Sequence, residues 1–434
     1  MNSAQPTKFQ RPDTSSAVDI GAVEERVPMH TQEFAQNPHG YYRFMREYYG
    51  DLPLIPVWID EGIPATLVIK YETARRILHD PAHFAADPRP WQLKLPTDRR
   101  LDFLPMVEWR SNALRSNGDS PEHKRYREAT QYALSRVNQF DMLDRLEVEA
   151  HELINSFCAD GASWEQPLDL IQHYVAPLTF KMLNHMVGSP PEIMARIAKA
   201  SADLFEGQDT VETNVQLESA LLDLISLRRA DLGNDITSRL IAHESGLSDM
   251  EIVQQLVTCL SAGTQIPADL AATTLKLLLT TPIDERPLTK TALNQVLATD
   301  PPLANYQLTY PRQPIAIDGV WLPANEPVIV SLVACSSDPS INNGDYHSDG
   351  WHAGFGFGPH ECPNDAKNIS LQIVQGLVDW LFDILPDIQL AVPAESLVWR
   401  PGPFARGLVA LPVVFPRTPP QTPTSRPTAS QYTS

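Results

Sequence analysis

The sequence has few cysteines, and none of them are paired at the spacing of a metal-binding knuckle. Its 434 residues include only Cys158, Cys259, Cys335 and Cys362, and no two of these form a C-x-x-C arrangement. A disulfide framework and a zinc ribbon are therefore not indicated. Because free thiols persist in a reducing compartment, we expect a cytoplasmic protein.

Basic residues and long apolar runs are also scarce. The 34 Lys and Arg residues stand against 53 Asp and Glu residues, which gives a formal net charge of -19. This balance argues against nucleic acid or an anionic membrane as the main partner. No stretch reaches the roughly 18 uncharged apolar residues of a membrane span, and the N-terminus lacks the apolar core of a signal peptide. We expect neither a nucleic-acid nor a membrane partner.

Both ends of the chain are poor in apolar residues. We expect residues 1–25 to form a disordered arm, and residues 416–434, rich in Pro, Thr and Ser, to form a disordered tail. Such segments cannot bury enough apolar surface to offset their chain entropy. Residues 26–415 contain no internal repeat and no linker composition, so we expect a single domain there.

Helical periodicity dominates that domain. Apolar residues recur at steps of three and four in residues 71–80, 125–157 and 251–281, whereas β-like runs are confined to residues 64–71 and 310–334. The pattern predicts a mainly α fold with a small β portion. The third of these helices contains Gly263 and Pro267, so we expect it to open or kink over residues 262–266, either at a site or as a packing kink.

Residues 354–365 read GFGFGPHECPND. Neither phosphate-loop spacing can be placed on these glycines, so a phosphate loop is excluded. Two other interpretations of Cys362 stay open. It could be a nucleophile paired with His360, two positions away, or it could be a small buried apolar residue.

The context of Cys362 favours a third interpretation. Asn364 or Asp365 is a suitable N-cap for the amphipathic helix that follows, which puts Cys362 just before a helix N-terminus. The backbone amides of Gly356 and Gly358 can approach the sulfur, and Phe355 can shield it from water. A thiolate in such surroundings suits the axial ligand of a haem iron.

The segment Phe355-Gly356-x-Gly358-x-His360-x-Cys362 resembles the cysteine-ligand loop of the cytochrome P-450 superfamily. Residues 67–87, 119–127 and 399–413 are similar to further segments of the bacterial members, in the same order. The resemblance implies the cytochrome P-450 fold, haem b with Cys362 as its metal ligand, and the following cofactor-binding residues: His123, Arg127, His352, Phe355, Gly356, Gly358, His360 and Cys362.

Two segments depart from the family pattern. The family's Glu-x-x-Arg pair is replaced by Gln295 and Ala298, and we expect neutral side chains to have repacked there. Minor departures are Asn364 in place of a glycine and Thr309 in place of a propionate-binding arginine, for which Arg312 is a candidate substitute.

The second departure concerns proton delivery. The family's acid and alcohol correspond to Gln265 and Ile266. An amide cannot act as an acid near neutral pH, so we expect water held by Gln265 or Thr264 to carry protons. We therefore assign Cys362, Gln265 and Thr264 as catalytic, and the resemblance adds the substrate-binding residues Ala262, Gly263, Ile266 and Phe404.

The resemblance implies a haem-thiolate monooxygenase that uses O2 and two electrons, drawn from NAD(P)H through ferredoxin reductase and a ferredoxin bound near Lys124 and Arg125. The implied reaction is hydroxylation or epoxidation of a bulky secondary metabolite, such as a thiopeptide antibiotic precursor. The alternatives are a haem-binding carrier or scaffold that does not oxygenate and, more distantly, a cysteine hydrolase.

Overall fold

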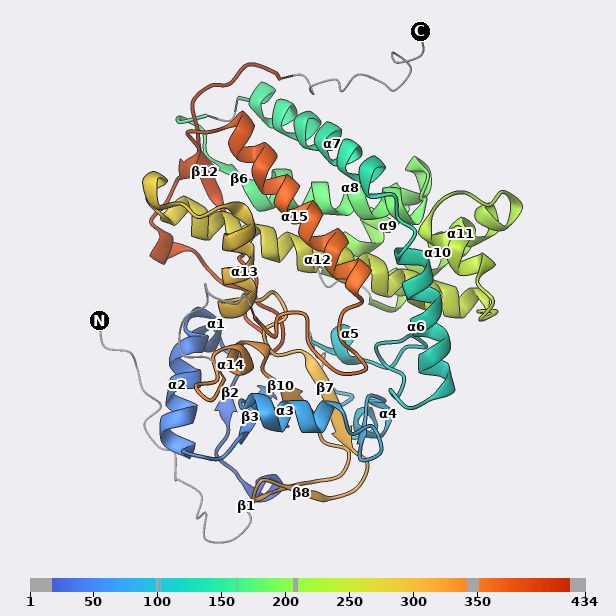
Figure 1. Ribbon diagram of the computed structural model, residues 1–434, viewed down its shortest axis with the longest axis vertical. Coiled ribbons are helices and arrows are strands. Elements are labelled where there is room, and N and C mark those ends of the chain that lie inside the picture. The colour runs from blue at the N-terminus through green and yellow to red at the C-terminus, as the bar shows by residue number, and fades with distance from the viewer. Residues whose placement is uncertain are drawn as a thin grey trace.

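The computed structural model describes residues 18–98, 101, 103–161, 163–205, 210–341 and 351–421. Most helices gather in one part of the molecule and most strands in another, as Figure 1 shows. The expected mainly α fold with a small β portion is confirmed. The helices are α1 (Gln32–Gln36), α2 (Pro38–Tyr49), α3 (Tyr71–Leu78), α4 (Arg89–Gln92), α5 (Leu104–Val107), α6 (Pro121–Leu134), α7 (Gln139–Ala159), α8 (Ala176–Val187), α9 (Pro191–Phe205), α10 (Thr210–Ala230), α11 (Ile236–Ala242), α12 (Asp249–Thr280), α13 (Thr289–Thr299), α14 (Leu332–Ser336) and α15 (Asn364–Ile384).

The strands form three sheets. The largest has the order β2-β3-β4-β10-β7-β5, and the two smaller ones have the orders β1-β9-β8 and β11-β12-β6. In the largest sheet β10 runs parallel to β4 and antiparallel to β7, which joins the first quarter of the chain to the last third. The strands are β1 (Val18–Asp19), β2 (Val27–Pro28), β3 (Leu54–Asp60), β4 (Ile63–Val68), β5 (Phe84–Ala85), β6 (Leu168–Asp169), β7 (Gln307–Pro311), β8 (Ile315–Ile317), β9 (Val320–Leu322), β10 (Val328–Val330), β11 (Gln389–Leu390) and β12 (Pro412–Val414).

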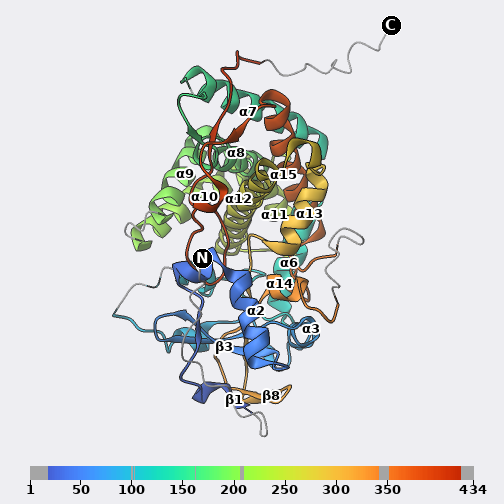
Figure 2. The same cartoon turned by 90° about the vertical axis from the view of Figure 1, so that its left-hand side faces the viewer.

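Helix α12 is the axis of the helical part. It packs against α8, α10, α13 and α15, and Figure 2 shows it among these helices. A capping box at its start explains where it begins, because Ser248 and Glu251 satisfy each other's backbone amides. Of the two expected outcomes at residues 262–266, the helix does not open. It continues through Pro267 to Thr280, although a prolyl residue has no N–H to donate a helical hydrogen bond.

The described parts of both ends contact the rest of the fold. Val18 and Asp19 pair with β9, and Ile20 is buried, so the ordered chain begins before the expected boundary at residue 26. Residues 1–17 and 422–434 lie outside the described residues. At the other end, Gln421 exchanges two hydrogen bonds with Asn155 of α7, at 2.7 and 2.8 Å. No helix among the described residues is both long and apolar enough to cross a bilayer.

The C-terminal end of α13 carries the two positions where the ion pair is missing. The Ala298 side chain is 3% exposed and belongs to the core. Two residues later, Asp300 pairs with Arg406 at 2.6 Å and with His39 at 3.2 Å, which ties this end of α13 to the C-terminal segment and to α2. A different ionic cluster therefore braces the chain just beyond α13.

Restoring the family pair should not stabilise the protein. We expect the double variant Gln295→Glu/Ala298→Arg to unfold at a lower temperature than the parent, because a new buried ion costs several kcal/mol before any attraction is counted. The single Ala298→Arg change should be worse, since it leaves the charge unpaired. Thermal unfolding followed by circular dichroism measures both, and a double variant more stable than the parent would show that the missing pair is a defect.

Candidate functional site

The cysteine loop leads directly into α15. Cys362 stands two residues before Asn364, the first residue of the helix, so its expected place near a helix N-terminus is confirmed. The expected cap is wrong. Pro363 is the N-cap and makes no side-chain capping bond, while Asn364 and Asp365 lie inside the helix. The backbone N–H of Cys362 donates to the carbonyl of Phe355 at 3.0 Å, which folds the loop back on itself.

Two of the three glycines of this loop, Gly356 and Gly358, are required by the backbone. Gly356 has φ of 71° and Gly358 has φ of 79°, in the region that side chains other than glycine rarely adopt. A Cβ at Gly356 would lie 2.7 Å from the side chain of Gln307, and one at Gly358 would lie 3.0 Å from the carbonyl of Leu78. The loop therefore packs too closely on β7 and α3 for larger residues.

Gln307 is a residue that the sequence analysis missed. Its amide forms two hydrogen bonds with the backbone of Phe357, donating to the carbonyl at 2.8 Å and accepting from the N–H at 3.1 Å. This pairing fixes the middle of the cysteine loop on β7. A lone glutamine in a strand gives no sequence signal for such a contact, 50 residues away.

His360 holds the loop against the chain that precedes α6. Its Nε2–H donates to the carbonyl of Ser116 at 2.8 Å, and its ring meets the ring of His123 edge-on, with centroids 4.7 Å apart. Burial lowers the pKa of His360 to about 4, so the ring is neutral near pH 7. The structure thus brings His123 and His360 together and gives His360 a loop-positioning contact.

Two arginines, the half-buried Arg127 and the buried Arg115, lie near these histidines. Arg127, one turn after His123 on α6, makes no hydrogen bond or ion pair with the described residues, and burial lowers its pKa. Burial, and after it the charge of Arg127, lowers the pKa of His123, and the same charge opposes the burial that raises the pKa of Cys362, so Arg127 lies near both. A cation held in this way is suited to an anionic group.

Arg115 is the second residue that the sequence analysis missed. It is 6% exposed, its charge lowers the pKa of His360, and it donates to the hydroxyl of Tyr306 at 2.6 Å and to the carbonyl of Met106. The expected substitute, Arg312, is bound elsewhere: it donates to the carbonyl of Pro81 at 3.1 Å and pairs with Asp119 at 3.4 Å. The Thr309 hydroxyl donates to the carbonyl of Ala85.

Cys362 is a half-buried free thiol. Burial raises the pKa of the thiol to about 11, against the opposing charges of Lys367 and Arg127. Without a metal the sulfur is therefore a neutral thiol near pH 7, and binding an iron would remove its proton. The Lys367 ammonium lies 6.0 Å from the ring centroid of Phe355, so the first turn of α15 contacts the beginning of the cysteine loop.

His352 lies at the beginning of the same loop. Its Nδ1 accepts a hydrogen bond from the N–H of Gly354 at 3.1 Å, and its ring centroid is 5.7 Å from that of Phe355. Burial lowers the pKa of His352 to about 4. This neutral ring can donate from Nε2 to an anionic group while its Nδ1 stays occupied.

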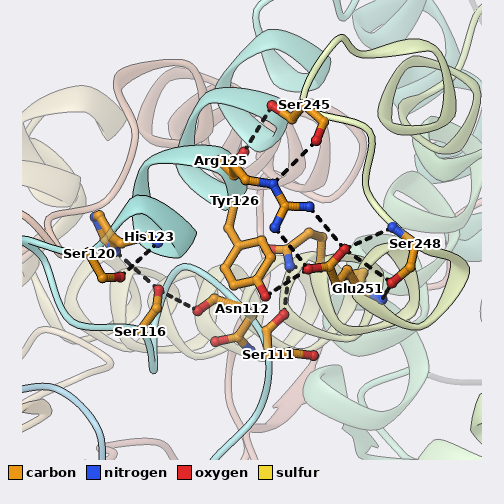
Figure 3. A network of polar contacts seen from close by, with 11 residues as sticks. Ser111, Asn112, Ser116, Ser120, His123, Arg125, Tyr126, Ser245, Ser248 and Glu251 are labelled. Carbon is orange, nitrogen blue, oxygen red and sulfur yellow. Dashed lines mark hydrogen bonds and ion pairs between the residues drawn. The ribbon is translucent and has the colours of Figure 1, made fainter.

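A polar network fixes α6 to the beginning of α12, as Figure 3 shows. Arg125 donates to both oxygens of Glu251, at 3.1 and 3.2 Å, and the Tyr126 hydroxyl donates to the same carboxylate at 3.0 Å. Although burial alone would raise the pKa of Glu251, hydrogen bonds from Ser248, Arg125 and Tyr126 lower it to about 2. Arg125 is thus engaged within the protein, and Lys124 is the more exposed of the two cations.

The candidate residues of α12 have different surroundings. Ala262 is exposed in the middle of this mostly buried helix, and Ile266, one turn later, is partly exposed. Gly263 faces α8 instead, where a Cβ would lie 2.7 Å from Leu183, so its lack of a side chain permits helix packing. Its assignment to substrate binding is not supported by this contact.

Two further candidates are placed by the same helix and by the C-terminal segment. Gln265 donates to Asp269 at 3.1 Å, whereas Thr264 has no side-chain partner among the described residues. Phe404 is 1% exposed and packs edge-on against Phe103 and Tyr306. It therefore lies in the core beside Tyr306, the partner of Arg115.

These residues fit a haem. The thiol of Cys362 can ligate the iron, and the propionates would find Arg127, His123, His352 and the buried Arg115 as donors. Two glycines at which a Cβ would be too close to neighbouring atoms keep the loop tightly packed, and the one half-buried arginine without a partner among the described residues lies near the cysteine.

Removing that arginine should loosen the cofactor. We expect Arg127→Leu to lose haem to apomyoglobin roughly tenfold faster than the parent, because a charge-assisted hydrogen bond contributes about 1.5–3 kcal/mol. The exposed Arg136→Leu, near the end of the same helix, is the control. Equal rates of haem loss for Arg127→Leu and the parent would mean that Arg127 does not bind the cofactor.

Known proteins support this interpretation of the site. No family model matches the chain. Cytochrome P450 105A3 of Streptomyces carbophilus is 26% identical over 83% of this chain and 90% of its own, and the mycinamicin IV hydroxylase/epoxidase of Micromonospora griseorubida is 26% identical over 85% and 94%. Among solved structures, testosterone-bound CYP154C4 from a Streptomyces species aligns with a TM-score of 0.78 at 22% identity, covering 91% of this chain and 99% of its own. The complex of the P450 MycG with mycinamicin IV aligns with a TM-score of 0.73 at 25% identity, covering 90% and 100%. With this fold and a cysteine loop of this geometry, the chain belongs to the cytochrome P450 superfamily and is a monooxygenase of that type.

Proposed function

We propose that this protein hydroxylates or epoxidises a bulky secondary metabolite, and that a modified peptide such as a thiopeptide precursor is one such substrate. The observation that carries the proposal is the packed loop that presents Cys362 two residues before α15. The printed names of similar proteins support the reaction class, since they include a mycinamicin IV hydroxylase/epoxidase, a vitamin D(3) 25-hydroxylase and a naphthoate hydroxylase.

The bound haem supplies the oxygen chemistry, and the protein supplies its environment. Cys362 ligates the iron, while Arg127, His123, His352 and Arg115 hold the propionates. His360 and Gln307 position the cysteine loop through backbone contacts at 2.8 Å each. Ala262 and Ile266 line the substrate side of α12, and Gln265 and Thr264 orient water there. In this proposal all of these residues belong to one domain, which extends from β1 to the end of β12.

The electrons come, in this proposal, from NAD(P)H through ferredoxin reductase and a ferredoxin. All four cysteines are free thiols, which supports a reducing, cytoplasmic setting for such donors. The donor approaches the face formed by the start of α6 and the start of α15. Arg125 cannot serve as a free docking cation because Glu251 binds it through two hydrogen bonds. We therefore expect the ferredoxin to dock near Lys124.

Reversing that charge should slow electron transfer. For Lys124→Glu we expect the ferredoxin concentration at half-maximal reduction to rise by a factor on the order of 10 at low ionic strength, and by less in high salt. Stopped-flow reduction under carbon monoxide measures it. Arg43→Glu in α2, far from α6 in Figure 1, is the control. An equal effect of both changes would indicate a response to net charge and no docking at Lys124.

Turnover tests the reaction itself. The haem-loaded protein, NADPH, a plant-type ferredoxin and its reductase are incubated with mycinamicin IV, testosterone, vitamin D3 and a thiopeptide precursor, and products are analysed by mass spectrometry. The proposal expects a product 16 mass units heavier for at least one compound. Efficient NADPH oxidation and haem reduction without product from any bulky metabolite would favour a haem-binding carrier or scaffold.

A further inference from the structure

A buried ion pair lies one helical turn beyond the water-orienting residues of α12. The Asp269 residue is 3% exposed, and both of its carboxylate oxygens accept hydrogen bonds from Nη2 of Arg400, one at 2.5 Å. Gln265, four residues earlier on the same helix, donates from Nε2 to Oδ2 of Asp269 at 3.1 Å. The three side chains therefore form one connected polar chain inside a mostly apolar helix bundle.

The C-terminal segment closes over this pair. The N–H of Arg400 donates to the carbonyl of Gly407 at 2.9 Å, and Trp399 bridges to Leu408 across the same turn. A Cβ at Gly407 would overlap both the Asp269 carboxylate and the Arg400 guanidinium. The packing thus holds the carboxylate in one place, while the Arg400 side chain, 25% exposed, connects it to solvent.

Helix α12 lacks one backbone N–H donor at Pro267, two residues after Gln265. Because Pro267 has no N–H, the carbonyl of Gly263 lacks the donor four residues later that a regular α-helix supplies. The side chain of Gln265 has its own carbonyl oxygen, which accepts no hydrogen bond from the described residues. Each of these oxygens can accept a hydrogen bond from water, since an amide oxygen and a peptide carbonyl are both acceptors.

The amide of Gln265 cannot bind and release a proton near neutral pH, whereas a carboxyl group can. Burial raises the pKa of Asp269 to about 6, against the opposing effects of Arg400 and Gln265. Arg400 is the charged group that faces it from the packed segment, and Gln265 is the polar group from its own helix. The carboxyl group therefore exchanges its proton near neutral pH, which neither Gln265 nor Ile266 can do.

We infer that Asp269, held by Arg400, is a positioning residue that exchanges protons with water bound at Gln265 and so feeds the reduction of O2 at this site. The inference rests on the proposed function. In that reaction a substrate C–H bond, O2, two electrons and two protons give an alcohol and water. Breaking the O–O bond requires a proton on the oxygen atom that leaves as water. When this proton arrives too slowly, O2 takes up two electrons and two protons and is released as hydrogen peroxide.

The test needs no substrate. Haem-loaded protein consumes O2 with NADPH, a plant-type ferredoxin and its reductase, and the oxygen ends either as peroxide or, with four electrons and four protons, as two waters. For Asp269→Asn we expect the ratio of water to peroxide to fall by roughly tenfold, because proton transfer by a positioned group is typically worth 10²–10⁴-fold and bound water replaces part of it. The parent ratio should change between about pH 5 and 7, and the variant ratio should not.

A rescue and a matched control separate proton transfer from structure. Gln265→Glu in the Asp269→Asn background returns a carboxyl group to the water site and should restore the ratio. Asp235 is also a buried aspartate paired with an arginine, since Arg228 lies 3.0 Å from its carboxylate, but it is far from Gln265 in the sequence. Asp235→Asn is therefore the matched control. It should lower the unfolding temperature and leave the ratio unchanged.

A second measurement is independent of oxygen chemistry. We compare the unfolding temperatures of the haem-loaded parent and of Asp269→Asn. The difference in favour of the parent should shrink as pH rises from about 4 through 6, because the raised pKa of Asp269 contributes stability that is lost over that range. An unchanged water-to-peroxide ratio in Asp269→Asn overturns the inference, as does a lowered ratio that Gln265→Glu does not restore. Failure to oxidise any metabolite would contradict the proposed function alone, because neither measurement requires a substrate.

Discussion

Replacing Cys362 by alanine is expected to abolish the long-wavelength Soret band that ferrous haem shows with carbon monoxide when a thiolate is its ligand. Cys362 provides the one sulfur in the packed loop before α15, and no other cysteine lies near its position in the sequence. Without it the iron has no protein thiolate, so any haem that still binds should absorb at shorter wavelength. Difference spectra of the reduced protein with and without carbon monoxide measure the change.

Cys158→Ala is the matched control for this experiment. Cys158 is also a half-buried free thiol, but it lies near the end of α7, and burial raises its pKa to about 11, as for Cys362. This variant should keep the full spectrum. A long-wavelength band that persists in Cys362→Ala would mean that the ligand has been assigned to the wrong residue.

The second large effect concerns stability. Arg400→Met is expected to lower the free energy of unfolding by about 3 kcal/mol at pH 8, because removing one partner of a buried pair leaves an uncompensated charge. Asp269, whose side chain is 5% exposed, would be that charge. At pH 5 the loss should be smaller, since Asp269 has a pKa of about 6 in the parent and a higher one without the arginine, so it is then protonated and neutral.

The double variant Asp269→Leu/Arg400→Met completes the cycle. Replacing both partners by apolar side chains of similar volume is often neutral, so the double variant should regain most of the loss at pH 8. Urea unfolding at both pH values gives the four free energies. A loss for Arg400→Met that is equal at pH 5 and pH 8 would show that the exposed part of the arginine, and not its pairing with Asp269, matters.

The cysteine loop could be predicted from the sequence because its determinants are local. Gly356 and Gly358 are needed for their own backbone angles, and Cys362 lies next to the helix that follows it in the chain. His123 and Arg127 are one turn apart on α6, so their shared face also follows from spacing alone. The mainly α fold followed from periodicity in the same way.

Tertiary structure alone decided the contacts that join distant segments. Arg400 meets Asp269 across 131 residues, and Arg125 meets Glu251 across 126, so neither pair leaves a local pattern in the sequence. Sequence reasoning therefore treated Arg125 as a free cation and overlooked Asp269, Arg115 and Gln307. It also expected Pro267 to open or kink α12, and packing against α8, α10, α13 and α15 keeps the helix from opening. Local propensity sets which elements form, but the burial of charges and the continuity of a proline-containing helix depend on what packs around them.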